Sequence, residues 1–309
     1  MIPPTPPPLV SILVISWNTR SLLDECIHSV YSTAEGIPVE IIVIDNGSVD
    51  GSLDMVATKY PDVVLVQNHE NVGFARANNQ AAELAHGEYL LLLNSDAQLL
   101  PQTLANFVNH AQSHPNMGAA GAQLRYPDGR FQYSHADFPT LWRELLILST
   151  LGRRIFGEWY PSHGPEEETG PKIVDYIHGA CMFIPRNIYQ AAGGLPEQYF
   201  MYAEEVDFCL TLHRMNLQVW YHPLARVLHH GGASSQNRAV DREGDMYQSR
   251  VRFMRKYRGN IAAELLKMEI ILLTAPKLIY HGAVRKLSRG RYGRPVIPFN
   301  RLLARLREV

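Results

Sequence analysis

The chain lacks a strong net charge of either sign. Its 309 residues carry a formal net charge of −1, and 46% of them are hydrophobic against 19% charged. This composition is typical of a globular protein and gives no reason to expect nucleic acid as a partner. The length is enough for one large α/β domain or two smaller ones.

Cysteine is scarce, and an export signal is missing. Cys26, Cys181 and Cys209 show no metal-type spacing, which argues for a reducing compartment and against a disulfide framework. We expect Cys26 and Cys209 to be small apolar residues on helix faces. Residues 1–8 form a proline-rich leader without the basic start and apolar run of a signal peptide, so we expect a cytoplasmic protein.

Two common nucleotide-binding motifs are also absent, because the chain contains neither GxGxxG nor GxxxxGKS or GxxxxGKT. It instead alternates short apolar runs with segments of helical periodicity. We expect strands at residues 9–16, 39–44, 63–66 and 89–93, with helices between them. This alternation indicates βαβ units and a largely parallel sheet.

Three of these strands are followed by polar side chains: Trp17-Asn18, Asp45-Asn46 and Asn94-Ser95-Asp96. In a parallel sheet the three ends lie on one edge, where open α/β sheets bind their ligands. A nucleotide-sized crevice is therefore expected, with Asp96 as a site for a divalent cation that recruits phosphate. The alternative is a set of ordinary strands that end in polar turns.

A second polar cluster lies at Glu204, Glu205 and Asp207, at the start of an expected helix. The three carboxylates match the dipole of a helix amino terminus. They also repel one another, so one of them can gain a raised pKa suited to a general base. Further on, His229 and His230 precede two glycines, which makes them candidate metal ligands, although such pairs are more often structural.

Residues from about 125 to 172 interrupt the alternation of strands and helices. They contain a Pro-Asp-Gly turn, an expected helical segment at 138–159 and a loop at 161–171. We interpret them as an insertion that helps shape a substrate site. Beyond it we expect one apolar strand at Tyr176–Arg186, in which Gly179 permits close backbone approach, and a loop at Val227–Gln236.

The carboxyl-terminal segment, residues 250–309, is basic and partly apolar. Its longest apolar run is interrupted by Pro276 and Lys277 and is too short to span a bilayer. The segment fits either an interfacial helix on anionic lipid or a terminal helix packed on the domain with a solvated basic face. The basic residues that favour the first possibility are Lys277, Arg285, Lys286, Arg289, Arg291 and Arg294.

Taken in order, the motifs resemble the inverting glycosyltransferases of family two, and within them the rhamnosyltransferase-like members. The resemblance covers residues 9–235 and implies a GT-A fold over 9–249: a mostly parallel, Rossmann-like sheet flanked by helices, followed by a helical extension. The matching segments are VSILVISWN (10–18), VIDNGSVDGS (43–52), NVGFARANN (71–79), LLLNSDA (91–97), HGACMFIPR (178–186), FMYAEEVDFCLTLHR (200–214) and HHGGASS (229–235).

The resemblance also implies roles for individual residues. Asp96 stands at the family's DxD position as the carboxylate expected on Mg²⁺ or Mn²⁺, with Asn94 in place of the first Asp. Glu205 stands where the family carries its general base, with Asp207 as the second choice, and His229 is favoured over His230 as a further metal ligand. Gly179, Ala180 and Glu204 belong to the acceptor side. The residues implied on the donor side are Ser16, Asn18, Asp45, Asn71, Gly73, Arg76, Asn94, Ser95 and Asp96.

The expected reaction is a metal-dependent, inverting sugar transfer from a nucleotide-diphosphate donor to a hydroxyl of a saccharide or lipid-linked saccharide. The resemblance favours dTDP-L-rhamnose as donor, with UDP-sugars second, and the basic tail suggests peripheral contact with the inner face of the cell membrane. A nucleotidyltransferase is the rival enzyme, but it would usually carry a glycine-rich, basic loop where this chain has Trp17-Asn18-Thr19. A non-catalytic sugar- or nucleotide-binding module is the other alternative.

Overall fold

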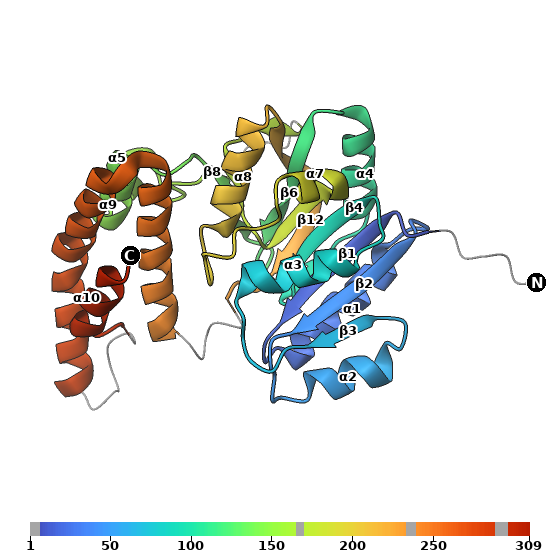
Figure 1. The fold of residues 1–309 in the computed structure, drawn as a ribbon, viewed down its shortest axis with the longest axis horizontal. Helices are drawn as coiled ribbons and strands as arrows, with labels where there is room; N and C mark the ends of the chain where they lie inside the picture. The colour runs from blue at the N-terminus through green and yellow to red at the C-terminus, as the bar shows by residue number, and fades with distance from the viewer. Residues whose placement is uncertain (1–6, 165–169, 233–238, 288–295) are drawn as a thin grey trace, which may run out of the picture. The chain divides into compact units, whose positions relative to one another are not determined.

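The computed structural model describes residues 7–164, 170–232, 239–287 and 296–309. The chain divides into two compact units, coloured along the sequence in Figure 1. Unit 1 comprises Met1–Asp137, Ser162–Gln198 and Glu204–Ser234, and unit 2 comprises Phe138–Pro161, Tyr199–Ala203 and Ser235–Val309. Most of the leader, the segment after Gly232 and Arg289, Arg291 and Arg294 lie outside the described residues, and so do the predictions made for them.

Unit 1 is built on one mixed sheet in the order β3-β2-β1-β4-β11-β6-β12-β5. Strands β3, β2, β1 and β4 run parallel, β11 is antiparallel to both its neighbours, and β6 and β12 are again parallel. The predicted α/β class with a mostly parallel sheet is therefore confirmed. The strands are β1 Val10–Ser16, β2 Val39–Asp45, β3 Val64–Gln67, β4 Tyr89–Asn94, β5 Ala97–Leu99, β6 Met117–Arg125, β7 Phe131–Gln132, β8 His135–Ala136, β9 Lys172–Ile173, β10 Tyr176–Ile177, β11 Cys181–Pro185 and β12 Gln218–His229.

Buried apolar strands hold the sheet between its helices. Residues 10–14, 41–44 and 90–93 are buried, as expected for strands covered on both faces. Helix α1 places Leu23 and Ile27 in the same core, and Cys26 and Cys209 are buried on helices as predicted. The helices of unit 1 are α1 Arg20–Thr33, α2 Ser52–Lys59, α3 Phe74–Leu84, α4 Thr103–Ser113, α7 Arg186–Ala191 and α8 Glu204–Arg214.

The strand register brings the polar strand ends to one edge. Ser16 at the end of β1 is level with Asp45 at the end of β2, and Ile15 is level with Asn94 at the end of β4. Because the three strands are adjacent and parallel, the polar residues that follow them converge, as the sequence predicted.

Two predictions about the later strands were wrong. The segment Tyr176–Arg186 is not one strand, because β10 pairs with β8 in a separate small sheet and β11 pairs with β4 and β6. A turn at Gly179 and Ala180 separates them. The segment Val227–His229 is not a loop but the end of β12, where it pairs with the unpredicted strand β5. These partners are distant in sequence, so local composition did not reveal them.

Unit 2 is helical, and the expected helical segment at 138–159 forms two of its helices. Helix α9 bends at Gly259 (φ 88°, ψ 174°), which gives it a first arm before and a second arm after this residue (Figure 1). Both arms contribute to an apolar core with α10, through Val251, Leu266 and Leu302. The helices are α5 Leu141–Leu148, α6 Leu151–Phe156, α9 Ala239–Leu287 and α10 Phe299–Arg307.

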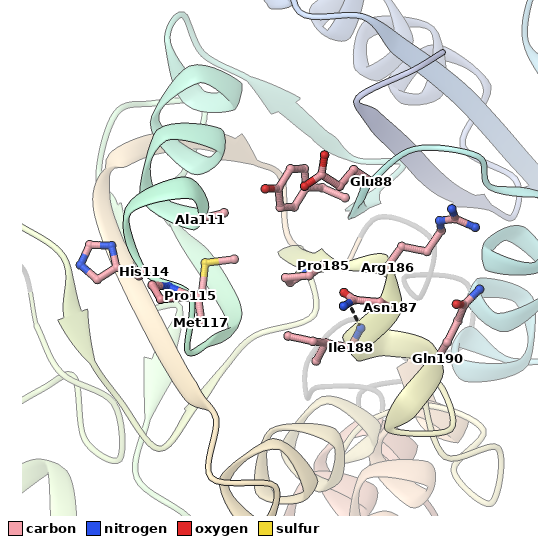
Figure 2. Close-up of a pocket in the computed structure, with 11 residues that line it drawn as sticks. Glu88, Ala111, His114, Pro115, Met117, Pro185, Arg186, Asn187, Ile188 and Gln190 are labelled. Carbon is pink, nitrogen blue, oxygen red and sulfur yellow. Dashed lines mark hydrogen bonds between the residues drawn. The ribbon is translucent and has the colours of Figure 1, made fainter.

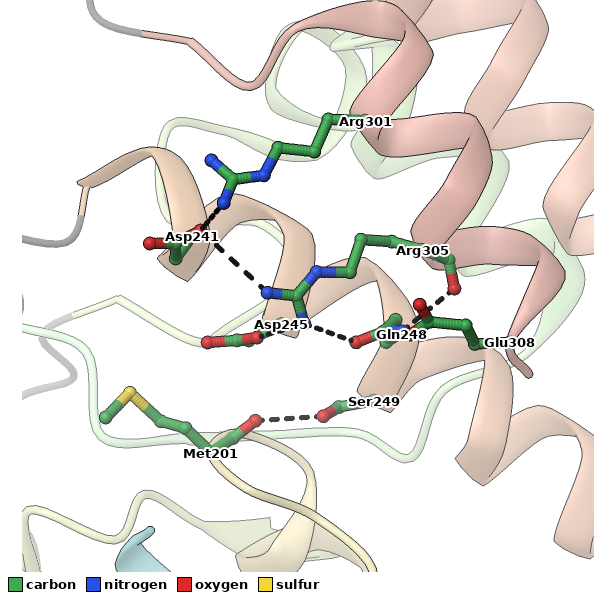
Figure 3. A network of polar contacts seen from close by, with 8 residues as sticks. All are labelled: Met201, Asp241, Asp245, Gln248, Ser249, Arg301, Arg305 and Glu308. Carbon is green, nitrogen blue, oxygen red and sulfur yellow. Dashed lines mark hydrogen bonds and ion pairs between the residues drawn. The ribbon is translucent and has the colours of Figure 1, made fainter. Parts of the chain in front are cut away.

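Ion pairs and hydrogen bonds connect α10 to the first arm of α9. The Arg305 guanidinium lies 3.1 Å from Asp245 Oδ1 and donates to Gln248 Oε1 at 3.1 Å (Figure 3). The Gln248 amide in turn donates to the Arg305 carbonyl and to the Glu308 carboxylate, each at 2.9 Å. Both Arg305 and Gln248 are thus held at more than one point, which fixes the register of the two helices.

Candidate functional site

Asp96 and His229 face each other at the end of β4. Nε2 of His229 lies 3.2 Å from Oδ1 of Asp96 and 3.3 Å from Nδ2 of Asn94. Asp96 is 4% and His229 8% exposed, so both are largely removed from water. His229 arrives on β12, whose pairing with β5 places residue 229 beside residue 97. His230 is exposed and uses its backbone N–H, which donates to the Asp96 carbonyl at 3.0 Å.

The far side of the His229 ring is held by Gln132. The Gln132 side-chain oxygen lies 3.0 Å from Nδ1 of His229. With that oxygen as acceptor, Nδ1 carries a hydrogen, and Nε2 is the nitrogen that faces Asp96. Nε2 also lies within hydrogen-bond distance of the Asn94 amide. Nearby, burial and then His229 lower the pKa of His178 to about 4, so His178 is neutral near pH 7.

A chain of hydroxyl groups joins the ends of β1 and β4. Ser16 and Thr19 share a hydrogen bond of 3.1 Å, and the Thr19 hydroxyl donates to Ser95 Oγ at 2.9 Å. Ser16 and Ser95 are buried, at 0% and 2% exposure. Their hydroxyls therefore position the two strand ends, and the donor-side role of both residues stays a prediction.

Asp45 combines a structural oxygen with one that has no partner. Its Oδ1 accepts from the backbone N–H groups of Gly47 and Ser48 at 3.0 and 2.7 Å, which forms the tight turn after β2. Its Oδ2 is buried and finds no hydrogen-bond partner among the described residues. A buried, unsatisfied carboxylate oxygen is costly, which favours a bound ligand that donates to it.

Asn18 fixes the neighbouring loop. Its side-chain oxygen accepts from Val49 N–H at 2.9 Å, and its own N–H donates to Ser48 Oγ at 2.8 Å. Asn18 holds a left-handed φ of 53°, which asparagine tolerates better than most residues. The loops after β1 and β2 are thus tied together around Asp45.

The segment before α3 is arranged by side-chain to backbone bonds. Asn71 Oδ1 accepts from Gly73 N–H at 3.0 Å, and Asn46 donates to Asn71 Oδ1 at 3.3 Å. Arg76 is exposed in the first turn of α3 and forms no ion pair with any residue in the described parts of the chain. Arg76 is therefore a cation available to a diphosphate near these loops.

The turn at Gly179 and Ala180 connects this corner to the acidic helix. Asn94 N–H donates to the Ala180 carbonyl at 3.1 Å, which sets the turn against the end of β4. A Cβ atom at Gly179 would lie 3.3 Å from the Phe74 ring and 3.9 Å from Cβ of Glu205. A larger side chain at 179 would therefore crowd Phe74 and narrow the space beside Glu205.

The three carboxylates at the start of α8 have different surroundings. Glu204 and Asp207 are buried, at 4% and 1% exposure, whereas Glu205 is partly exposed. Burial, and then the charge of Glu205, raise the pKa of Glu204 well above its usual range. The carboxyl with the raised pKa is thus the fully buried one, whereas Glu205 is partly exposed although its Oε2 is buried.

The residues at this corner fit a divalent cation whose ligands come partly from the protein and partly from a substrate. No cluster of three or more His, Cys, Asp or Glu suited to a metal occurs in the described residues. Asp96 and His229 offer one oxygen and one nitrogen, and a cation bound through one or two protein groups usually completes its coordination with phosphate and water. The pair therefore fits Mg²⁺ or Mn²⁺ only in the presence of a donor diphosphate.

Comparison with known protein families decides the assignment. The family model described as glycosyl transferase family 2 matches residues 11–191, more than half of the chain. The chain belongs to this family. It is therefore a glycosyltransferase, as the resemblance of its motifs implied, and the matched region contains the Asp45 and Asp96 loops and the 179–180 turn.

The glycosyltransferase is similar to two named bacterial proteins. It is 28% identical over 241 residues to an N-acetylglucosaminyl-diphospho-decaprenol L-rhamnosyltransferase of Mycobacterium tuberculosis, covering 74% of this chain and 78% of the relative. It is 27% identical over 253 residues to the O-antigen biosynthesis protein RfbC of Myxococcus xanthus, covering 78% of this chain and 19% of that protein.

Solved structures share the GT-A fold with the glycosyltransferase. The mannosyltransferase PcManGT of Pyrobaculum calidifontis, in complex with GDP-Man and Mn²⁺, matches with a TM-score of 0.56 at 20% identity, over 98% of this chain and 80% of that one. GalNAc-T7 with UDP, GalNAc and Mn²⁺ matches with a TM-score of 0.57 at 16% identity, over 71% of this chain and 42% of that one. At these identities the likeness shows the fold alone.

A cavity of about 340 Å³ lies at the opposite edge of the sheet of this glycosyltransferase. Its walls include Tyr89 at the start of β4. Met117 at the start of β6 and Pro185 at the end of the antiparallel β11 also line it (Figure 2). The polar loops described above follow the carboxyl ends of β1, β2 and β4, whereas this cavity lies at the start of β4. The cavity is therefore separate from the candidate site.

Sequence reasoning missed Gln132 and His178. Gln132 lies in the expected insertion, 97 residues before His229, and nothing in its local sequence indicates a partner. His178 lies in the matching segment 178–186, but the resemblance implies no role for it. Neither residue follows or ends a strand that the sequence predicts, because β7 and β10 are short strands that only the structure shows.

Proposed function

We propose that the chain transfers a sugar from a nucleotide-diphosphate donor to an acceptor hydroxyl with inversion at the anomeric carbon. The observation that carries this proposal is the pairing of Asp96 with His229 near the turn at Gly179 and Ala180, which in turn lies close to Glu205. Donor-phosphate and acceptor groups can thus occupy neighbouring parts of one crevice. A nucleotidyltransferase remains less favoured, because Asn18 and Thr19 occupy the place of a glycine-rich phosphate loop.

The donor side is proposed to run from Asp45 to Asp96. The free Oδ2 of Asp45 accepts from the nucleobase or ribose, and Asn71, Gly73 and Arg76 lie on its phosphate side. A divalent cation at Asp96 and His229 would supply positive charge to the leaving diphosphate. Gln132 holds His229 in the tautomer that leaves Nε2 available.

The acceptor side is proposed to lie at Glu205. The Glu205 carboxylate removes the proton of the acceptor hydroxyl, and the oxygen then attacks the anomeric carbon on the face opposite the diphosphate. Asp207 is the weaker candidate for this role because it is buried and accepts from the Gln198 amide at 3.4 Å. Glu204, Gly179 and Ala180 shape the space around the acceptor.

The finer specificity is also a proposal. We favour dTDP-L-rhamnose as donor, with UDP-sugars as the alternative, because the sequence resembles rhamnosyltransferase-like members and a relative carries that activity in its name. The same relative acts on a decaprenol-linked sugar by its name, which supports a lipid-linked saccharide as acceptor here. Peripheral contact of the tail with a membrane would accompany such an acceptor.

A thermal-shift screen tests the donor and the cation together. We expect a dTDP- or UDP-sugar to raise the melting temperature more with Mn²⁺ or Mg²⁺ than with EDTA, since ligand binding to the folded state adds RT ln(1 + [L]/Kd) to its stability. Asp96→Ala should lose the metal-dependent part of the shift, whereas Asp54→Ala, which removes an exposed carboxylate on α2, should retain it. Equal shifts with cation and with EDTA in the wild type would contradict the metal role.

A further inference from the structure

The second arm of α9, residues 260–287, is apolar on two opposite faces. One face packs into the core of unit 2 through Ala263, Leu266, Ile270 and Leu278, each at most 5% exposed. Lys277 supports this side, since its ammonium donates to the Leu148 carbonyl at 2.8 Å. The packing requirement of the helix is therefore met by this inward face.

The outward face carries a second row of large apolar side chains, which we call the outer stripe. Its members are Ile261, Leu265, Met268, Leu272 and Ile279, with exposed fractions of 81%, 44%, 56%, 68% and 60%. Their spacing of four, three, four and seven residues places all five on one side of an α-helix. An amphipathic helix that needed only the core would carry polar residues there.

Basic residues stand at both ends of the outer stripe. Lys256 and Arg258 precede the bend at Gly259, and Arg285 and Lys286 close the arm, all with exposed side chains. The acidic Glu264 beside the stripe is neutralised, because it lies 2.7 Å from Arg255 and 3.0 Å from Lys267. The surface is thus apolar in its middle and positive at its ends.

The same combination occurs on α6 of unit 2. Ile155 and Phe156 are 63% and 62% exposed and follow the exposed Arg153 and Arg154. Exposed apolar side chains next to basic ones therefore occur twice in unit 2, once on α9 and once on α6, which lies outside the basic tail.

These features favour a lipid surface over a second copy of the chain. A parallel or antiparallel pair of these arms would bring basic ends against basic ends, which repel. An anionic bilayer instead receives apolar side chains in its interfacial layer and attracts the flanking lysines and arginines. No helix in the described ranges is long and apolar enough to cross a bilayer. A helix that lies along the surface needs no such length.

We propose that the outer stripe of α9 docks unit 2 on an anionic membrane, with the arm lying in the interfacial layer. The proposal deepens the proposed function by identifying the membrane-contacting surface, and it rests on that function only in supposing a lipid-linked acceptor. The physical argument for the surface itself uses only the exposure and charges of unit 2.

Vesicle sedimentation of the full chain tests this docking. The vesicles contain either phosphatidylcholine alone or phosphatidylcholine with about one third phosphatidylglycerol, a composition whose anionic surface attracts basic segments. We expect the wild type to sediment with the anionic vesicles and to be released by high salt. The double variant Met268→Glu and Leu272→Glu should lose at least about tenfold in partition, because two charges cannot enter the apolar layer.

A matched variant separates the stripe from net charge. Asn260→Glu with Asn300→Glu adds the same two charges at exposed sites of unit 2 outside the stripe. This control should lose clearly less partition than the stripe variant, because its two charges reduce only the electrostatic attraction, by about 1 kcal/mol or less each near the surface. Ile279→Ser gives a milder stripe variant that should weaken binding with the fold retained. Equal binding by the stripe and control variants would overturn the proposal.

Two further readouts make the remaining outcomes decisive. Light scattering tests whether the stripe is instead an interface between two copies of the chain. A wild-type dimer that the stripe variant converts to a monomer, together with no binding to vesicles, would overturn the proposal. Donor turnover with a water-soluble acceptor should be the same in all variants. Absence of turnover in a wild type that binds vesicles would refute the proposed function and leave the docking surface standing.

Discussion

The strand-end site of unit 1 and the outer stripe of unit 2 depart from an ordinary protein surface in opposite ways. In the site, ionisable groups such as Asp45 and Glu204 are buried, and each keeps a carboxyl oxygen without a hydrogen-bond partner among the described residues. On the stripe, side chains such as Ile261 and Leu272 are apolar and exposed. Each arrangement has a cost in the isolated chain that a partner of matching chemistry would remove.

The contrast is consistent with the two proposals, which place catalysis and membrane contact in different parts of the chain. The site residues are fixed by hydrogen bonds from several strands, which suits catalysis that depends on accurate geometry. The stripe residues stand on one continuous helix and need only to face the same way, which suits a non-directional surface interaction. Variants in one region should therefore leave the function of the other intact.

Removing the proposed general base should produce the largest effect, and that effect should be confined to the site. We expect Glu205→Gln to lower kcat by about 10²- to 10⁴-fold, the usual contribution of a positioned base, while donor binding stays near the wild-type value. Steady-state kinetics and a donor thermal shift measure the two quantities. Glu205→Asp keeps a carboxylate and should retain part of the activity. Turnover of Glu205→Gln equal to that of the wild type would contradict the assignment of Glu205 as the general base.

Alanine substitutions at two leucines of the second arm of α9 should have different effects on stability, because one leucine lies on the inward face and the other on the outer stripe. Leu266 is fully buried, so Leu266→Ala should reduce the free energy of unfolding of unit 2 by about 2–5 kcal/mol. Leu272 is 68% exposed, and Leu272→Ala should change it by no more than about 0.5 kcal/mol. Hydrogen exchange along α9 measures both. Similar losses for the two variants would mean that the stripe is covered within the folded chain.

Removing the hydrogen-bond acceptor that orients His229 should have a smaller effect, again confined to the site. We expect Gln132→Leu to weaken Mn²⁺ binding in the presence of nucleotide by about 10- to 100-fold, because the His229 ring loses its orienting acceptor. Isothermal titration with Mn²⁺ and nucleotide gives the affinity directly. Gln132→Glu keeps an acceptor oxygen and should bind the cation well, and Gln190→Leu on α7 serves as a distant control. Unchanged affinity in Gln132→Leu would remove Gln132 from the positioning role.

Prediction from sequence worked best where the structure depends on local order. The polar residues after β1, β2 and β4 converge as expected, because the parallel pairing of adjacent strands follows from their buried apolar character and intervening helices. Prediction from sequence failed at two segments. Pairing with β8 decided the conformation at the start of Tyr176–Arg186, and pairing with β5 decided that of Val227–His229. The roles of Asp96, His229 and Glu205 remain predictions that the geometry supports.

The sequence by itself determined the family, the α/β class and the edge of the sheet at which the polar residues gather, since motif order and hydrophobic periodicity are local properties of the chain. Only the tertiary structure decided which nitrogen of His229 faces Asp96, which of Glu204 and Glu205 is buried, and which apolar residues of α9 face outward. These three outcomes depend on burial and on contacts between segments far apart in sequence, and no local pattern encodes them.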